Sequence, residues 1–244
     1  MTHIRPRIPL AGVFGGGGLF GIGYGLGIVD GLRKQGVELR GCPMLGTSAG
    51  SWVAAATALE VSFSDLVRLA VPRFPNPRSG VLANSAAVVF GQRHDATVHV
   101  VACSLPRLRR TELSGAVYPL STLVAASSAV PGLLAPQRLG RHLYIDGGVR
   151  SGVSVDLATP AELLVVIAPL AGAMFGPFGG LVERKMDREM EMWRDAGGRR
   201  TLVFSPNQTT SDIAKWPQDL FDKDKAVEAY YRGLSEASRT PIPT

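Results

Sequence analysis

Short apolar runs alternate with amphipathic stretches along most of the chain. Buried strands are predicted over residues 8–14, 42–46, 96–105, 141–146, 162–170 and 201–205. Apolar residues at helical spacing predict helices over residues 22–35, 49–59, 122–130, 181–196 and 217–236. Because strands and helices alternate, the pattern predicts an α/β layered domain with a largely parallel sheet.

The chain has no internal repeat and no break in composition. With 244 residues, 45% of them hydrophobic, it can bury one full core, so residues 1–244 are predicted to form a single domain. Residues 237–244 contain two prolines and few apolar side chains, and we expect them to form a frayed tail. No apolar run approaches the roughly 20 residues of a membrane span, and the two cysteines need not pair, so a cytoplasmic location is predicted.

The net charge of +6 is spread along the chain. Its densest cluster is Arg107, Arg109 and Arg110, and no aromatic residue interleaves with it. This pattern predicts no nucleic-acid partner. Two interpretations stay open, a solvated basic face and a mild attraction to anionic surfaces such as lipid headgroups.

Ser48 lies in the sequence GTSAG, between a predicted strand and a predicted helix. In that context the pattern is typical of a nucleophile elbow, a strained turn that needs small neighbours such as Gly46 and Gly50. The helix N-terminus behind the serine would favour negative charge on a reacting oxygen. The alternative is a glycine-rich turn whose serine caps the helix.

A nucleophilic serine needs a group that accepts its proton. No histidine follows residue 142, where a hydrolase triad would need one; the four are His3, His94, His99 and His142. Asp146 ends a predicted strand and precedes Gly147 and Gly148. Strand ends gather at one edge of a parallel sheet, so Asp146 is expected to meet Ser48 there, although an Asp-Gly-Gly sequence alone is also typical of an ordinary turn.

The sequence GGGGLFG at residues 15–21 supports two interpretations. Gly16, Gly18 and Gly21 follow a strand as in a dinucleotide-binding fingerprint, which also requires an acidic residue after the second strand. Glu38 has about the right separation but precedes that strand. Glycine amides at a helix N-terminus can equally form an oxyanion hole, which the neighbouring motifs favour.

The glycine loop, GTSAG and DGG, in this order, resemble the patatin-like phospholipase family. AASSAVPGLLAPQ and HLYIDGGVRSGVSVDLA also resemble family segments, and the similarity is strongest over residues 10–170. The resemblance implies a three-layer α/β/α fold with a mostly parallel central sheet. It further implies hydrolysis of lipid acyl esters, as in a phospholipase A or lysophospholipase, without a metal or other cofactor.

Carried over by position, the resemblance makes Ser48 the nucleophile and Asp146 the base. The oxyanion amides would come from Gly16, Gly17 and Gly18. Many members carry a cation where this chain has Phe20. That departure keeps open a catalytically weak or inactive patatin-like fold that binds lipid or serves as a scaffold.

Apolar residues near basic ones suggest peripheral contact with a membrane or micelle surface. They are Phe175 and Phe178, in a glycine-rich loop at residues 171–180, and Trp193, in the predicted helix over residues 181–196. Alternatively, that helix packs on the sheet through Val182, Met186, Met190 and Trp193.

Overall fold

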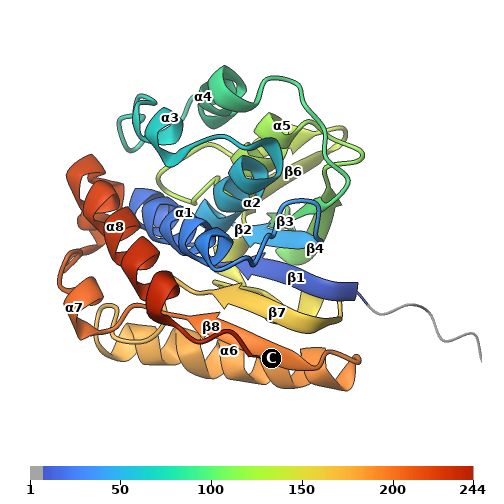
Figure 1. Cartoon of the computed structure of the whole chain (residues 1–244). Coiled ribbons are helices and arrows are strands. Elements are labelled where there is room, and N and C mark those ends of the chain that lie inside the picture. The colour runs from blue at the N-terminus through green and yellow to red at the C-terminus, as the bar shows by residue number, and fades with distance from the viewer. Residues whose placement is uncertain (1–7, 244) are drawn as a thin grey trace, which may run out of the picture.

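A computed structural model describes residues 8–243 and contains one central sheet (Figure 1). Its strand order is β5-β6-β3-β2-β1-β7-β8, and β4 pairs with β3. The bounds are β1 (Ile8–Phe14), β2 (Met44–Thr47), β3 (Val98–Ser104), β4 (Arg109–Ser114), β5 (Gln137–Leu139), β6 (His142–Asp146), β7 (Ala161–Ile167) and β8 (Arg200–Phe204).

The sheet is mixed but mostly parallel. Strands β1, β2, β3, β7 and β8 pair in parallel, whereas β4, β5 and β6 pair antiparallel. The predicted α/β class is therefore confirmed. Strands β4 and β5 are not predicted from the sequence, because the partly exposed sequences RRTELS and QRL lack an apolar signal.

The helices cover both faces of the sheet. Their bounds are α1 (Gly18–Lys34), α2 (Ala49–Leu59), α3 (Phe63–Val67), α4 (Val81–Phe90), α5 (Leu120–Ser127), α6 (Pro177–Asp195), α7 (Gln208–Ser211) and α8 (Lys223–Arg239), with 3₁₀ segments η1 (Gly147–Val149), η2 (Val155–Leu157) and η3 (Pro217–Phe221). Figure 1 shows α6 under one face of the sheet and α1, α2 and α8 over the other, which gives the three expected layers.

Alternate residues of the central strands serve the two layers. In β7, Val165 and Ile167 join the core under α1 and α2, whereas Leu164 and Val166 join the core under α6. This follows from the two-residue period of a strand. The apolar run of β7 is continuous because both of its faces are buried.

Helix α6 packs on the sheet through the face that its apolar spacing predicts. Met186, Met190 and Trp193 are buried against the sheet, and the Trp193 indole donates a hydrogen bond to the Thr159 carbonyl at 3.2 Å. The suggestion that Trp193 contacts lipid is therefore wrong, since the side chain is fully buried. Phe178 lies at the start of the helix and is 48% exposed.

Helices α1 and α8 pack with their backbones in contact. A Cβ added to Gly23 or to Gly27 would lie only 2.1 Å from the carbonyl oxygen of Ala226 or Tyr230. Such close approach requires glycine. The contact also corrects the start of the expected tail, because α8 continues to Arg239 and Ala237 is fully buried against α1. Residues 240–243 form no helix or strand, and Thr244 falls outside the described residues.

Two smaller expectations concern thiols and membrane spans. Cys42 and Cys103 are both free thiols. Within residues 8–243, none of the helices combines the length and the apolarity needed to cross a bilayer.

Candidate active site

Ser48 occupies a strained turn between β2 and α2. Its φ of 53° and ψ of −121° are rare for a residue with a side chain. A Cβ on Gly46 would lie 2.4 Å from the Ser51 Cα, and one on Gly50 would lie 1.9 Å from the Phe14 carbonyl oxygen. Both neighbours must therefore be glycine. The Ser48 side chain makes no capping hydrogen bond, so the interpretation as a capping serine is wrong.

Hydrogen bonds from three elements hold this turn. The Ser48 amide donates to the Ser127 hydroxyl at 2.8 Å, and that hydroxyl donates to the Val101 carbonyl at 2.8 Å. The Ser51 hydroxyl donates to the Ser48 carbonyl at 2.6 Å. Residues of β3, α5 and α2 thus hold the strained conformation. They bind the Ser48 amide and carbonyl, and none of these hydrogen bonds uses the Ser48 hydroxyl.

Strand register brings Asp146 to Ser48. Thr47 pairs with Val101 of β3, and the next β3 residue, Ala102, pairs with Asp146 of β6. Strands β2 and β6 therefore pair with successive parts of β3, and Asp146 lies just beyond the end of β2. Asp146 was expected to meet Ser48 at the edge where parallel strands end. That explanation was wrong, because β6 runs antiparallel to β3.

Asp146 is almost fully buried, and burial raises its pKa to about 6. Hydrogen bonds to the carboxylate from the Ser48 hydroxyl and from the Gly148 amide, the latter at 2.6 Å, lower the pKa in part. Desolvation outweighs both. A carboxylate of this basicity is ionised at neutral pH and accepts a proton more readily than an exposed aspartate.

The glycine loop lies next to Ser48. A Cβ on Gly16 would be 3.5 Å from the Ser48 Cβ. The Gly16 amide is already engaged, since it donates to the Gly152 carbonyl at 2.8 Å. The amides of Gly17 and Gly18 find no hydrogen-bond acceptor among the described residues, and they begin α1. These two amides can therefore receive an anionic oxygen.

The geometry does not favour a dinucleotide site at this loop. Glu38 lies before β2, where it pairs with Arg33 at 2.9 Å and accepts from the Arg40 amide. The residue that follows β2 is Ser48. Phe20, which stands where the family resemblance implies a cation, is fully buried and stacks on Tyr24 with ring centroids 6.3 Å apart.

The histidines within residues 8–243 lie outside the site. His99 pairs with Glu112 at 2.6 Å, and this contact raises the His99 pKa. His142 is exposed beside Tyr144, and His94 contacts the Gly115 carbonyl. None of the three lines the cavity that contains Ser48 and Asp146. His3 falls outside the described residues.

A cavity of about 590 Å³ opens over Ser48 and Asp146. Its floor includes Gly16, Gly17 and Gly18, and its walls are mostly apolar. Side chains from many separate segments build these walls, among them Ile22, Trp52, Leu66, Leu82, Leu134 and Leu220. This lining cannot be predicted from the sequence, because its residues are scattered along the chain and carry no shared motif.

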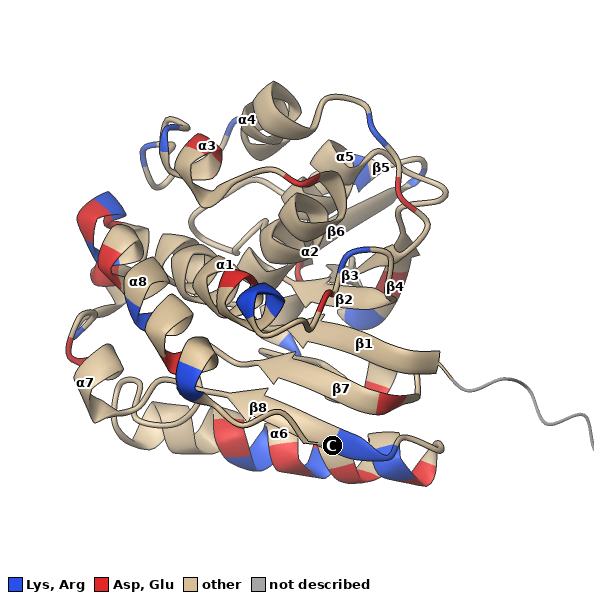
Figure 2. Cartoon of the chain, viewed as in Figure 1, with Lys and Arg blue, Asp and Glu red and all other residues tan. Residues whose placement is uncertain are grey.

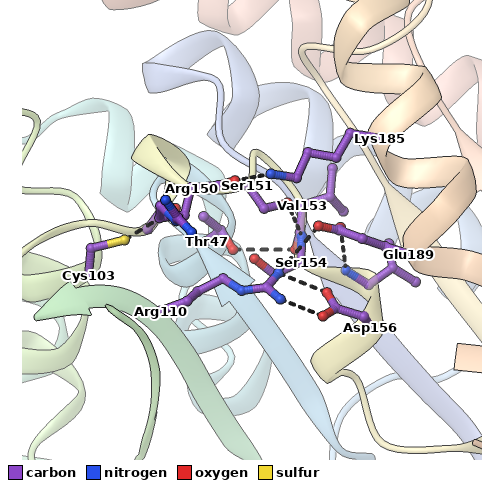
Figure 3. A network of polar contacts seen from close by, with 12 residues as sticks. Thr47, Cys103, Arg110, Arg150, Ser151, Val153, Ser154, Asp156, Lys185 and Glu189 are labelled. Carbon is purple, nitrogen blue, oxygen red and sulfur yellow. Dashed lines mark hydrogen bonds and ion pairs between the residues drawn. The ribbon is translucent and has the colours of Figure 1, made fainter. Parts of the chain in front are cut away.

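A buried polar network fixes the segment that follows Asp146 (Figure 3). The Arg110 guanidinium donates to Asp156 at 2.8 Å and to Glu189 at 3.3 Å. Glu189 also accepts from the Val155 amide at 3.0 Å and from the Ser151 hydroxyl. Arg110 therefore belongs to an internal network rather than to a solvated basic face.

One comparison with known proteins agrees with the family resemblance. A model of the patatin-like phospholipase family matches residues 85–159, a segment that contains Asp146. Among solved structures, VipD from Legionella pneumophila is 12% identical, with a TM-score of 0.46, over 96% of this chain and 67% of that chain. The family match confirms the resemblance and supports, in general terms, a lipid hydrolase.

Proposed function

We propose that this protein is a carboxylic ester hydrolase that cleaves lipid acyl esters, with Ser48 as nucleophile and Asp146 as base. One observation carries the proposal. The Ser48 hydroxyl, on a strained turn, hydrogen-bonds a buried carboxylate whose pKa is raised to about 6, at the floor of an apolar cavity. Perturbed acids beside a candidate nucleophile are typical of catalytic sites.

The reaction needs only these two side chains and one water. Asp146 accepts the Ser48 proton as the serine oxygen bonds to the ester carbonyl carbon. When the carbonyl re-forms, the bond to the alcohol breaks and the alcohol leaves with that proton. Water then attacks the acyl-serine, Asp146 takes its proton, and that proton returns to Ser48 as the fatty acid leaves.

The tetrahedral intermediates carry a negative oxygen. We assign the amides of Gly17 and Gly18 to it, since they are unengaged and lie at the N-terminus of α1. Gly16 serves differently, because its missing side chain leaves room for substrate beside Ser48.

The shape and lining of the cavity support this substrate class. Its volume of about 590 Å³ and its apolar walls suit an acyl chain. Val149, Phe178 and Leu181 line the cavity and are 45%, 48% and 60% exposed. We propose that these residues touch a membrane or micelle surface from which a phospholipid or lysophospholipid enters.

The test compares ester turnover by wild type, Ser48→Ala, Asp146→Asn and the control Ser85→Ala. Ser85 also lines the cavity, but its hydroxyl donates to the Val81 carbonyl. We expect each of the first two variants to lose at least about 10³-fold in kcat, and Ser85→Ala to stay within threefold. Equal rates in wild type and Ser48→Ala would overturn the proposal. Fluorophosphonate labelling of wild type without turnover of any lipid on a broad panel would favour the inactive, lipid-binding alternative.

A further inference from the structure

A second cavity lies beside the catalytic one, along α6. Its volume is about 600 Å³, and it is lined by Arg110, Asp156, Leu181, Arg184, Lys185, Arg188, Glu189 and Met192. Leu181, Lys185 and Glu189 also line the catalytic cavity. The two cavities therefore lie side by side and share lining residues of α6.

Helix α6 separates its charges by face. Arg184, Lys185 and Arg188 line the second cavity, whereas Glu183, Asp187 and Glu191 recur every four residues and do not line it. Figure 2 shows both signs along this helix. Residues three and four apart share a helix face, so these three cations line the cavity and these three acids do not. Glu189, the acid of α6 that does line the cavity, pairs with Arg110.

The cations of this cavity differ in their partners. Arg110 is engaged by Asp156 and Glu189, and these two carboxylates offset its positive charge. Lys185 donates to the Arg150 carbonyl, and the Arg184 Nε donates to the Gly180 carbonyl at 3.2 Å. Within residues 8–243, Arg184, Lys185 and Arg188 pair with no carboxylate. Three positive charges thus remain available to an anion.

We propose that the second cavity binds the phosphate of a lipid substrate whose acyl chain occupies the catalytic cavity, and that it favours anionic over zwitterionic headgroups. The inference rests on the proposed hydrolase function and adds headgroup selectivity to it. Two guanidinium groups and an ammonium match the oxygens of a phosphate. A choline group beside that phosphate would meet these same cations, and like charges repel.

The selectivity test uses lysophosphatidic acid and lysophosphatidylcholine with the same short acyl chain, both below their micelle concentrations. Wild type should give the higher kcat/KM with the anionic substrate. The double variant Arg184→Gln/Arg188→Gln should lower the ratio of the two values about tenfold. The control Arg194→Gln removes a cation from the same helix that contacts Thr201 and lies outside both cavities, so it should leave the ratio unchanged.

The outcomes separate this inference from the proposed function. Ser48-dependent turnover of a neutral soluble ester tests the hydrolase alone. If that turnover is present but the two lysophospholipids react equally, or if the preference appears only on vesicles, the headgroup site is wrong. An equal drop in the ratio for Arg194→Gln would also overturn it, since general charge would then explain the preference.

Binding to Ser48→Ala, measured by calorimetry, distinguishes a lipid headgroup from free phosphate. Lysophosphatidic acid should bind at least tenfold more tightly than glycerol 3-phosphate, because its chain adds apolar burial in the neighbouring cavity. Equal affinities would show a site for free phosphate and would overturn the headgroup assignment. The double variant should weaken both ligands.

Discussion

The hydroxyl of Ser127 accepts a hydrogen bond from the backbone amide of Ser48 at 2.8 Å. Ser127 is buried, and its own proton goes to the Val101 carbonyl. The proposed nucleophile is therefore positioned by a side chain that does not touch the substrate in the proposed mechanism.

Replacing Ser127 should disturb this turn. We expect Ser127→Ala to destabilise the fold by about 1–3 kcal/mol, because a buried amide loses its acceptor. We also expect kcat to fall about tenfold or more, with KM little changed, as the Ser48 oxygen shifts. Ser127→Thr, which keeps a hydroxyl, should rescue much of both. Loss of stability without any loss of kcat would limit Ser127 to a structural role.

The activity should follow the ionisation of Asp146. Its carboxylate must be charged to accept a proton, and burial raises its pKa to about 6. For a neutral soluble ester, kcat/KM should therefore rise through an apparent pKa near 6 and level off above pH 7. A profile that is flat from pH 5 to 8 would contradict this assignment.

Asp146 should also weaken the fold at neutral pH. A folded-state pKa of about 6 lies above the ordinary aspartate value of 3.8, so folding favours the protonated form and stability falls as the pH rises from about 4 to 6. That difference corresponds to a cost of up to about 3 kcal/mol. Asp146→Asn should therefore unfold at higher denaturant than wild type at pH 8, and the gain should vanish below pH 4. An equal gain at both pH values would show that charge burial is not its cause.

The contact between α1 and α8 should not tolerate a methyl group. Gly27→Ala would place a Cβ 2.1 Å from the Tyr230 carbonyl oxygen, so the two helices must move apart. We expect a loss of about 3 kcal/mol or more in the free energy of unfolding.

Gly180→Ala is the matched control for that substitution. Gly180 lies in α6, and nothing lies within 4 Å of its added Cβ. This variant should be neutral or stabilising by up to about 1 kcal/mol, since alanine favours helix. Similar denaturation midpoints for the two alanine variants would mean that the close packing of α1 and α8 contributes little.

Local sequence patterns were sufficient for the elements around the elbow. The predicted bounds of residues 8–14 and 49–59 match β1 and α2, because each run is mostly apolar and each is bounded by glycine or polar residues. Ser48 was located for the same reason. The position of Asp146 beside it could not be derived from local pattern, since it depends on a register between β3 and an antiparallel β6.

The residues that line the cavity could not be predicted from the sequence. Leu220 and Phe221 lie in the 3₁₀ segment η3, which the sequence analysis assigned to one long helix. Apolar side chains look alike whether they fill a core or face a cavity. Arg110 was similarly taken for surface charge, because its partners Asp156 and Glu189 lie 46 and 79 positions away.

The close packing of α8 on α1 has a consequence for synthesis. The glycine amides assigned to the oxyanion lie at the start of α1. The residues of α8 that pack against the backbone of α1 lie much later in the chain, near 226–237. A ribosome must therefore translate nearly all of the described chain before α1 can pack against α8. The proposed hydrolase would acquire its activity late, as a finished molecule, and a nascent fragment would not attack the lipids around it.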